Sequence, residues 1–347
     1  MTFRYIGSKA RIVAEIIEKL GPPSSYESRF VDLFCGTGAV AESAAKAGWA
    51  VHLNDQLHSA VIMAAARLVG SENARFESIG GYARTIDLLN ALPAERGFIC
   101  QSYSPESARE IGFERRYFTR ENAGRIDAMR RQIAGWKMGG AISICEERLL
   151  LADLMSAANR VANIAGTYGC FLAKWQKQAL GDIMMKARAL KQGEFRVTLS
   201  VLEAGQVKIQ SADIVYLDPP YTKRQYAAYY HLLETIALGD APIVSGVGGI
   251  RPWQQKASDF CYKTRAMSAF KTLLGSLAAE RVLVSYSDNA HVPIEELTAE
   301  IAFLGRATPL LLSEIGTYRP NRTASGGRTT VNEYLIELER TALQAAA

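Results

Sequence analysis

The sequence predicts an α/β protein: a Rossmann-like, mostly parallel sheet with helices on both faces, interrupted by a mainly helical insertion. Two stretches of alternating strand and helix signals, one near each end of the 347-residue chain, predict the sheet. Between them the chain has few β-branched runs and many apolar residues at helical spacing, which predicts the insertion. This length fits about two domains of roughly 100–200 residues each.

The first alternation occupies the first 53 residues. Apolar residues from Ile12 to Leu20 recur at helical spacing, and a Gly-Pro-Pro sequence ends that helix. A short apolar strand follows at 30–34, then a glycine turn, a helix of small residues at 39–47 and a strand at 50–53. A strand–helix–strand unit of this kind implies that its two strands pair in parallel.

The second alternation begins after residue 213. It predicts a strand at 214–217, a helix at 229–238 and a strand at 282–286. Residues 331–338 alternate well enough to form a final strand, which could lie at an edge of the sheet. We therefore expect residues 1–74 and 201–347 to form one domain, with residues 75–200 inserted and a helix at 146–165 as its clearest element.

The bulk composition limits the class of protein. No apolar run approaches the roughly 20 residues of a membrane span, and the N-terminus lacks the apolar core of a secretory signal. The five cysteines are scattered without a CxxC pair, which predicts reduced thiols in a cytoplasmic protein rather than a disulfide framework or a metal site. A formal charge of +5 permits a polyanionic partner without requiring one.

A glycine turn, Asp32 to Gly38, follows the first strand and opens the next helix. Glycines at positions 36 and 38 would let the backbone approach a ligand closely. Asn54 and Asp55 end the following strand, where a carboxylate can bind both hydroxyls of a ribose. The turn also satisfies the loose dinucleotide pattern, so it fits a dinucleotide and an adenosyl cofactor about equally. Asp32 favours the second, because it can face the amino group of a methionine moiety and would repel a pyrophosphate.

The tetrapeptide Asp218-Pro219-Pro220-Tyr221 comes directly after a predicted strand, where ligands of open α/β sheets bind. Its residues suit methylation of a planar exocyclic amine. The Asp218 carboxylate and the Pro219 carbonyl are acceptors for the amine hydrogens, and the prolines hold them rigidly. Tyr221 offers a flat face for an extruded base, a contact worth roughly 1–3 kcal/mol. A surface turn also uses Pro-Pro, but it requires neither the Asp before it nor the aromatic after it.

These segments resemble a known family. The tetrapeptide, the glycine turn and Phe3-Arg4-Tyr5-Ile6-Gly7-Ser8-Lys9 are similar to the catalytic, cofactor and N-terminal motifs of Dam-like DNA adenine methyltransferases, in the order of the alpha group. Five further segments resemble a restriction-modification subgroup: 117–127, 162–169, 224–235, 284–287 and 332–335. Together they span nearly the whole chain.

The resemblance implies a fold, a reaction and partners. The fold would be a class I methyltransferase sheet, with 1–74 and 201–347 binding S-adenosylmethionine and 75–200 recognising the target. The reaction would be direct in-line methyl transfer to N6 of a flipped-out adenine in double-stranded DNA, without a metal. The protein would be a monomer, and any cognate restriction endonuclease would act on the same site without being bound to it.

The candidate site residues fall into three groups. Candidate catalytic residues are Asp218, Pro219, Pro220 and Tyr221. Candidate cofactor-binding residues are Tyr5, Lys9, Asp32, Phe34, Gly36, Gly38, Asn54, Asp55, Glu203 and Asp218; the aromatic ones would line the cationic sulfonium, although core packing explains Phe34 nearly as well. Candidate DNA-binding residues are Lys9, Arg115, Arg116, Lys174, Lys177, Lys223, Arg224 and Tyr226. A solvated helical face is the alternative for any single basic residue, and we expect His231 on a helix surface.

One departure and three alternatives remain. Family members often have an acid shortly before the catalytic strand that contacts the cofactor adenine; here Leu202 stands at that spacing and Glu203 lies beside it. The same fold could methylate cytosine N4, RNA adenine or a protein glutamine amide, although Asp at 218 and the helical insertion favour DNA adenine. A dinucleotide-dependent oxidoreductase lacks a visible proton-relay pair. A DNA-binding protein without catalysis would not need both the glycine turn and Asp218.

Overall fold

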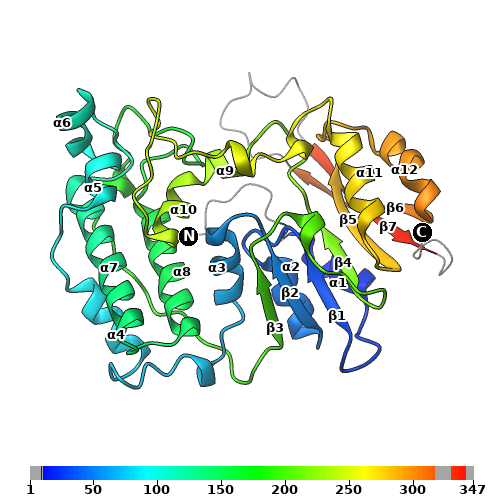
Figure 1. Ribbon diagram of the computed structural model, residues 1–347, viewed down its shortest axis with the longest axis horizontal. Coiled ribbons are helices and arrows are strands. Elements are labelled where there is room, and N and C mark those ends of the chain that lie inside the picture. Colours follow the sequence, from blue (N-terminus) through cyan, green and yellow to red (C-terminus); the bar gives the residue numbers. More distant parts are fainter. Residues whose placement is uncertain (1–8, 10, 317–329, 341–347) are drawn as a thin grey trace. The chain divides into compact units, whose positions relative to one another are not determined.

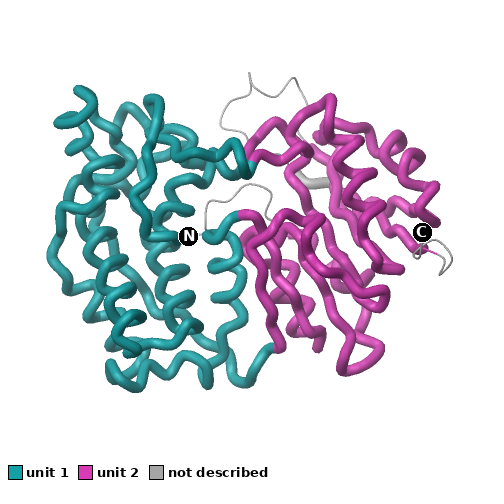
Figure 2. The backbone as a smooth tube through the Cα atoms, in the orientation of Figure 1, with its two compact units in different colours: residues 1–7, 57–195, 226–256 teal, residues 8–56, 196–225, 257–347 magenta. Residues whose placement is uncertain are grey.

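A computed structural model describes residues 9, 11–316 and 330–340 of the chain. Contacts group 57–195 with 226–256 as unit 1, and the other described residues as unit 2 (Figure 2). Relative to the expected insertion, 75–200, unit 1 also takes in 57–74 and 226–256. The reason is helix packing: α3 (His58–Ala66) packs on α8 (Ile144–Val161) and on α10 (His231–Leu238).

Unit 2 contains a seven-stranded sheet in the order β3-β2-β1-β4-β5-β7-β6 (Figure 1). The strands are β1 (Arg29–Asp32), β2 (Ala50–Asn54), β3 (Val197–Ser200), β4 (Ile214–Leu217), β5 (Arg281–Ser287), β6 (Arg306–Gly316) and β7 (Thr330–Glu339). The first five in the order pair in parallel, whereas β7 is antiparallel to both of its neighbours. The predicted mostly parallel sheet is confirmed.

Helices cover both faces of this sheet. They are α1 (Val13–Leu20), α2 (Ala39–Lys46), α11 (Ala266–Ser276) and α12 (Ile294–Ile301). Val31, Val215 and Val282 point to the face that packs on α11 and α12. Arg281, the neighbour of Val282, points to the opposite face and donates a hydrogen bond to the Leu20 carbonyl at the end of α1, at 2.9 Å. Alternation along the central strands β1, β4 and β5 therefore buries the middle of the sheet from both sides.

The final strand is not at an edge, and that expectation is wrong. β7 pairs with both β5 and β6, and β6 is the outer strand. The polar residues that made 331–338 resemble an edge strand have ion-pair partners: Glu337 lies 2.7 Å from Arg281, and Glu333 lies 2.8 Å from Lys9. At the other edge, β3 has no fully buried residue, so the sequence carried little signal for it.

Unit 1 is mainly helical, and its described residues form no strand beyond two isolated bridges. Its other α-helices are α4 (Tyr82–Asn90), α5 (Phe98–Tyr103), α6 (Ala108–Ile111), α7 (Arg120–Met138) and α9 (Tyr226–Tyr229). Short 3₁₀ helices complete the two units: η1 (Ser71–Asn73), η2 (Pro105–Ser107), η3 (Lys177–Leu180), η4 (Ala204–Gln206), η5 (Gln254–Lys256), η6 (Asp259–Cys261) and η7 (Ala302–Leu304). Among the described residues, no helix is long and apolar enough to cross a membrane.

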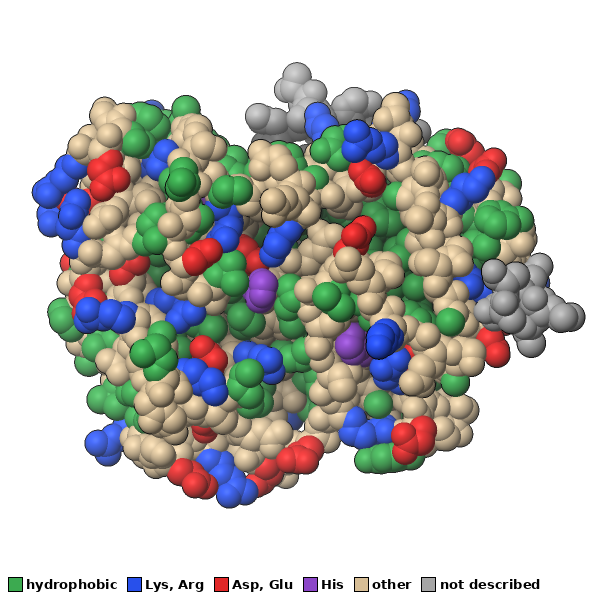
Figure 3. Space-filling view, viewed as in Figure 1, with side chains coloured by type: hydrophobic (Ala, Val, Ile, Leu, Met, Phe, Trp, Pro, Cys, Tyr) green, Lys and Arg blue, Asp and Glu red, His purple; other side chains and the backbone are tan. Residues whose placement is uncertain are grey.

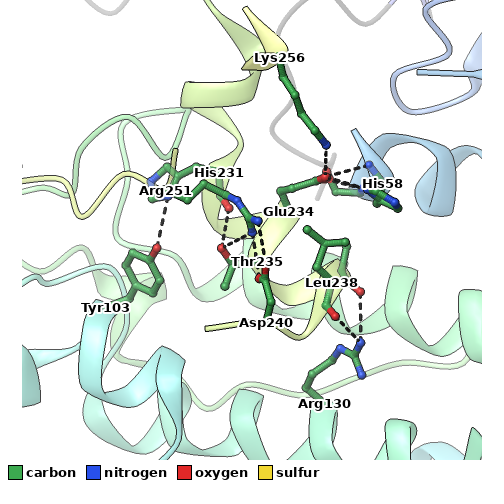
Figure 4. Close-up of polar contacts among 12 residues, drawn as sticks. His58, Tyr103, Arg130, His231, Glu234, Thr235, Leu238, Asp240, Arg251 and Lys256 are labelled. Carbon is green, nitrogen blue, oxygen red and sulfur yellow. Dashed lines mark hydrogen bonds and ion pairs between the residues drawn. The ribbon is translucent and has the colours of Figure 1, made fainter. Parts of the chain in front are cut away.

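A buried carboxylate ties α10 to the start of α3 (Figure 4). Glu234 is 2% exposed and accepts hydrogen bonds from the backbone N–H groups of His58, at 3.1 Å, and Ser59, at 2.9 Å. The Lys256 ammonium lies 3.0 Å away and His58 Nδ1 3.1 Å away. Because these donors are backbone groups at a helix N-terminus and a cation, this Glu234 cluster is a helix cap between two helices of one unit.

His231 is buried rather than on a helix surface, which corrects our expectation. Its ring is 0% exposed, and Nε2 lies 2.9 Å from the Tyr168 carbonyl. Burial, opposed by that hydrogen bond, lowers the pKa of His231 to about 4. The ring is therefore neutral at physiological pH and serves the core of unit 1.

Candidate active site

The carboxyl ends of β1, β2 and β4 meet at one edge of the sheet in unit 2. Asp32 is the last residue of β1, and its register partners are Leu53 on β2 and Tyr216 on β4. Asp55 follows β2 directly and Asp218 follows β4 directly. Parallel pairing thus brings three carboxylates to the same end of neighbouring strands, which we call the carboxyl edge.

The glycine turn is fastened to the end of β2. Gly36 and Gly38 have φ angles of 49° and 78°, a region that favours glycine. The Gly36 N–H donates to Asp55 Oδ2 at 3.1 Å, and the Cys35 N–H donates to the Asn54 carbonyl at 2.9 Å. These bonds hold the half-buried Asp55 carboxylate beside the turn.

Asp32 is a buried acid at the start of that turn, only 2% exposed. Burial raises its pKa well above the ordinary value; the charge of Asp218 and, to a lesser degree, that of Asp55 add to the rise, against a hydrogen bond from the Phe34 N–H at 3.3 Å. Carboxylates that crowd one another in this way favour a cationic ligand.

All hydrogen-bonding groups of the Asn54 side-chain amide are bonded to other residues of the protein. Its amide donates to the carbonyls of Leu33 and Leu202, both at 3.1 Å. The amide oxygen accepts from Ser200 Oγ at 2.7 Å and from the Leu202 N–H at 3.1 Å. Both donors and both acceptor positions are occupied, so contact between this amide and a cofactor would require breaking one of these bonds. Leu202 and Glu203, which follow β3, are both exposed.

The segment Asp218–Tyr221 faces Lys9. The Lys9 ammonium lies 3.4 Å from Asp218 Oδ1 and donates hydrogen bonds to Tyr221 Oη at 2.9 Å and to Glu333 Oε2 at 2.8 Å. Burial lowers the pKa of Lys9, but Asp218, Tyr221 and Glu333 outweigh burial and hold this pKa well above its ordinary value. The Lys9 side chain is only 5% exposed, yet it stays a cation because of these neighbours.

Asp218 has the opposite balance. Burial raises the pKa of its carboxyl, Lys9 lowers it and Glu333 raises it, which leaves a value of about 6. The carboxyl is therefore mostly ionised at neutral pH but more basic than a solvent-exposed aspartate. A carboxylate with these properties is a strong acceptor for amine hydrogens.

Three residues distant in sequence, Ser258, Cys261 and His291, anchor the candidate catalytic segment and the residues that follow it. The buried Cys261 thiol lies 3.3 Å from the Arg224 carbonyl, and burial raises the pKa of this thiol to about 12. The His291 N–H donates to the Tyr221 carbonyl at 3.1 Å. Gln225 exchanges two hydrogen bonds with the backbone of Ser258, at 2.8 and 3.0 Å. Residues 220–225 are therefore anchored at several points.

The aromatic candidates lie in different settings. Phe34 is half-buried and packs edge-on against Phe260, with ring centroids 5.7 Å apart. The ring of Tyr221 lies 5.6 Å from that of Tyr286. Tyr5 lies outside the described residues. Of the aromatic residues expected around the sulfonium, Phe34 is therefore described, and it also packs in the core.

The basic candidates divide into exposed and buried residues. Lys174, Lys177, Lys223 and Arg224 are exposed. Arg116 is 39% exposed and is bonded to Glu114 and to the Ala173 carbonyl, and Tyr226 is half-buried against Tyr230. Acidic and basic side chains are interspersed over the face shown in Figure 3. The charge pattern of this face therefore does not by itself mark a DNA-binding surface.

Arg115 does not face solvent, whereas the DNA contact expected from the sequence needs an exposed side chain. It is 5% exposed, and its guanidinium donates to the carbonyls of Ser102, at 3.3 Å, Gly246, at 3.0 Å, and Val247, at 3.1 Å. An arginine has five N–H donors and can join several backbone carbonyls at once. Arg115 therefore holds the turn 245–250 in unit 1.

Sequence reasoning missed Glu333, Cys261 and His291. The segment 332–335 was recognised as similar to a family segment, but nothing in the sequence assigned it a role. Cys261 and His291 carry no motif, because their contacts are with backbone carbonyls that only the folded chain brings near. Among the described residues, no group of three or more His, Cys, Asp or Glu could hold a metal ion.

Comparisons with known proteins identify the family of the chain. The family model for D12 class N6 adenine-specific DNA methyltransferases matches residues 5–298. The chain is 35% identical to Type II methyltransferase M.FokI of Planomicrobium okeanokoites over 85% of this chain and 46% of the relative. It is 34% identical to Modification methylase LlaI of Lactococcus lactis subsp. lactis, over 85% of this chain and 47% of the relative. It is 31% identical to Type II methyltransferase M.NlaIII of Neisseria lactamica, over 97% of this chain and 99% of the relative. The chain thus spans about half the length of the first two relatives.

Proposed function

The chain belongs to the D12 class N6 adenine-specific DNA methyltransferase family, and we propose that it transfers a methyl group from S-adenosylmethionine to N6 of a flipped-out adenine in double-stranded DNA. The observation that carries this proposal is the place of Asp218-Pro219-Pro220-Tyr221. The segment begins at the carboxyl end of β4, beside Asp32 at the carboxyl end of β1.

Membership of a methyltransferase family implies S-adenosylmethionine, and the carboxyl edge fits this cofactor. When bound, it supplies an electrophilic methyl group on a cationic sulfur. Asp32 would accept hydrogen bonds from its amino group, and Asp55 would bind the ribose. The mutual repulsion of Asp32, Asp55 and Asp218 supports this proposal, because a ligand with two positive charges relieves it. Glu203, exposed after β3, would reach the adenine, while Asn54 positions Leu202 beside it.

The catalytic segment would prepare the target nitrogen. The lone pair of an exocyclic amine is delocalised into the ring, so the nitrogen is a poor nucleophile. The Asp218 carboxylate and the Pro219 carbonyl would accept hydrogen bonds from the two N–H groups of this amine. These bonds would localise the lone pair on nitrogen. Pro219 and Pro220 restrict φ, and His291 holds the Tyr221 carbonyl, so these acceptors are preorganised. Tyr221 would stack on the extruded base.

Asp218 would also be the first acceptor of the proton that the amine loses. Its pKa of about 6 leaves it ionised before transfer and basic enough to accept that proton. Release to solvent then restores the carboxylate. This assignment uses no covalent intermediate with the protein.

The DNA would be bound by both units. Lys223 and Arg224 are exposed directly after the catalytic segment and would grip phosphates beside the flipped nucleotide. In unit 1, Lys174, Lys177 and Arg116 would contact the backbone, and Tyr226 lies where the chain enters this unit. We assign target recognition to unit 1, which contains nearly all of the insertion expected at 75–200.

The names of the relatives suggest a biological role. M.FokI and M.NlaIII are Type II methyltransferases, and LlaI is a modification methylase. By this likeness the chain would be the modification partner of a restriction-modification system, acting in the cytoplasm as a monomer. Its cognate endonuclease would cut the same site without binding to it.

Product analysis tests the proposed function. The full chain is incubated with methyl-labelled S-adenosylmethionine and mixed double-stranded DNA, RNA and protein, and the DNA is digested to nucleosides. We expect the label in N6-methyladenine, and the Asp218→Ala variant provides the background. Label in N4-methylcytosine, or only in RNA or protein, contradicts the proposal.

A further inference from the structure

Glu333 reaches the carboxyl edge from a strand that runs the opposite way. Because β7 is antiparallel to β5, its amino-terminal part lies beside the carboxyl end of β5, and Glu333 is paired with Ser287, the last residue of β5. Side chains two residues apart share a face. Glu333 and Glu337 on β7 therefore share the face of Leu283 on β5, which is paired with Tyr216 on β4. Glu333 thus lies on the face that also carries Asp32.

The Lys9 ammonium joins Glu333 to the catalytic segment. An ammonium has three N–H donors. Two make short hydrogen bonds, to Glu333 Oε2 at 2.8 Å and to Tyr221 Oη at 2.9 Å. Asp218 Oδ1 lies farther away, at 3.4 Å. The Lys9, Asp218 and Glu333 side chains are 5%, 18% and 15% exposed, so water screens these charges little.

We propose that Glu333 is a positioning residue for the catalytic carboxylate: it holds the Lys9 ammonium from β7, so that Lys9 anchors Tyr221 without closing a tight ion pair on Asp218. This role rests on the proposed function, in which Asp218 accepts hydrogens from the target amine. Every lone pair of Asp218 engaged by Lys9 is withdrawn from that task. Glu333 makes the shortest of the three contacts to the Lys9 ammonium, at 2.8 Å against 2.9 Å for Tyr221 and 3.4 Å for Asp218, and so keeps the Asp218 acceptor available.

The charges around Asp218 explain why one glutamate has this effect. Among the described residues, the titratable groups that interact electrostatically with Asp218 are the Lys9 ammonium, the Glu333 and Asp32 carboxyls, and the phenols of Tyr216 and Tyr221. Lys9 is the only cation among them, and it is shared by two carboxylates at 2.8 and 3.4 Å. Removing the negative charge of Glu333 leaves Asp218 as the carboxylate that Lys9 pairs with, while the hydrogen bond from Lys9 to Tyr221 remains.

Titration of Asp218 in the ligand-free full chain tests this role. The carboxyl carbons of aspartate are labelled with ¹³C, the Asp218 signal is assigned with Asp218→Asn, and its midpoint is measured in wild type, Glu333→Gln and Glu337→Gln. Glu337 is the matched control, because it lies on the same face of β7 and pairs with Arg281. We expect the Glu333→Gln midpoint to fall by roughly half a unit to one unit and the control to stay at the wild-type value.

Removal of the cation instead of the carboxylate should shift the Asp218 midpoint in the opposite direction. In Lys9→Met the Asp218 midpoint should rise, because burial and Glu333 both disfavour its charge and no cation opposes them. In methylation assays, Glu333→Gln should lower kcat by about tenfold and leave KM for DNA within about threefold, since Asp218 acts in the transition state rather than in binding. An unchanged or raised Asp218 midpoint in Glu333→Gln overturns the positioning role.

Failure of this inference is distinguishable from failure of the proposed function. The titration uses no DNA and no cofactor, so it remains readable if the chain methylates another acceptor. Conversely, adenine methylation by wild type together with an unmoved midpoint in Glu333→Gln refutes only the role of Glu333.

Discussion

Two carboxylates with opposite environments separate the structural and the chemical parts of this protein. Glu234 in unit 1 would have its pKa raised by burial, but His58, Lys256 and the Ser59 N–H lower it to about 2. Asp218 in unit 2 shares the Lys9 cation with Glu333, and its pKa rises to about 6. A fully satisfied buried acid stabilises the fold. An acid left with too few partners is stabilised by what it binds, which is typical of functional sites.

The largest effect is expected at the under-paired acid. Asp218→Ala should lower adenine methylation by about 1,000-fold or more, the loss typical of removing a preorganised polar group at a reacting atom. Binding to double-stranded DNA should stay within a few-fold, because the proposed phosphate contacts are made by other residues. Initial rates and a fluorescence-anisotropy titration measure the two quantities. Equal loss of both would assign Asp218 a structural role.

The satisfied acid should respond in stability instead. Glu234→Gln should lower the free energy of unfolding by roughly 3 kcal/mol at pH 7, because the shift from 4.5 to about 2 measures what the carboxylate gains on folding. This difference should be complete above about pH 4.5 and disappear as the pH falls toward 2, where Glu234 protonates. Urea denaturation at pH 7 and pH 3 measures it.

An exposed acid of unit 1 provides the control for Glu234. Glu72 is 56% exposed and lies 2.6 Å from Arg75. Glu72→Gln should change the free energy of unfolding by less than about 0.5 kcal/mol at either pH. A loss comparable to that of Glu234→Gln would mean that charge alone, rather than the buried cap, accounts for the effect.

Cations allow the same comparison between buried and exposed groups. Arg115→Met should cost about 2 kcal/mol of stability, because carbonyls of the turn 245–250 lose their donor inside the protein. Lys177→Ala should leave stability unchanged and reduce the salt dependence of DNA binding by about one phosphate contact. Thermal unfolding and binding at several salt concentrations test both. Loss of DNA affinity without loss of stability in Arg115→Met would restore its first assignment.

The last effect has the opposite sign and concerns the stability cost of the candidate active site. The raised pKa of Asp218 means that the folded protein pays a penalty for its charge that is absent below about pH 4 and complete above about pH 6. Asp218→Asn should therefore increase the free energy of unfolding by roughly 3 kcal/mol at pH 7.5 and leave it nearly unchanged at pH 4. Denaturation at the two pH values decides. Destabilisation at pH 7.5 would show that Asp218 is not strained.

The sequence predicted the elements whose signals are local. The strands that end at Asp32 and Asp218 are short apolar runs, and the glycine turn between β1 and α2 follows from its own residues. β3 was missed because it has no buried side chain. The place of β7 was mistaken because its glutamates look solvent-exposed until their partners, Arg281 and Lys9, are known.

The parts of the candidate site that lie within a sequence motif could be predicted. The parts that the fold brings together from distant positions could not. The tetrapeptide and the glycine turn lie at one edge of the sheet because parallel strands bring their ends together. Glu333 lies 324 residues from Lys9 in the sequence, and nothing local connects them. Arg115 shows the converse, because a basic residue within a basic stretch reads as a surface residue until its carbonyl partners are seen.

The pH dependence of adenine methylation tests most directly whether Asp218 is the acceptor of the amine. The substrate is unmethylated DNA that contains the target site. With wild-type protein, kcat/KM should be constant above about pH 7 and fall tenfold per pH unit below a midpoint near 6. This midpoint should coincide with that of the Asp218 carboxyl titration. The product should be N6-methyladenine throughout. A rate that stays constant down to pH 5, while Asp218 titrates near 6, would contradict the account.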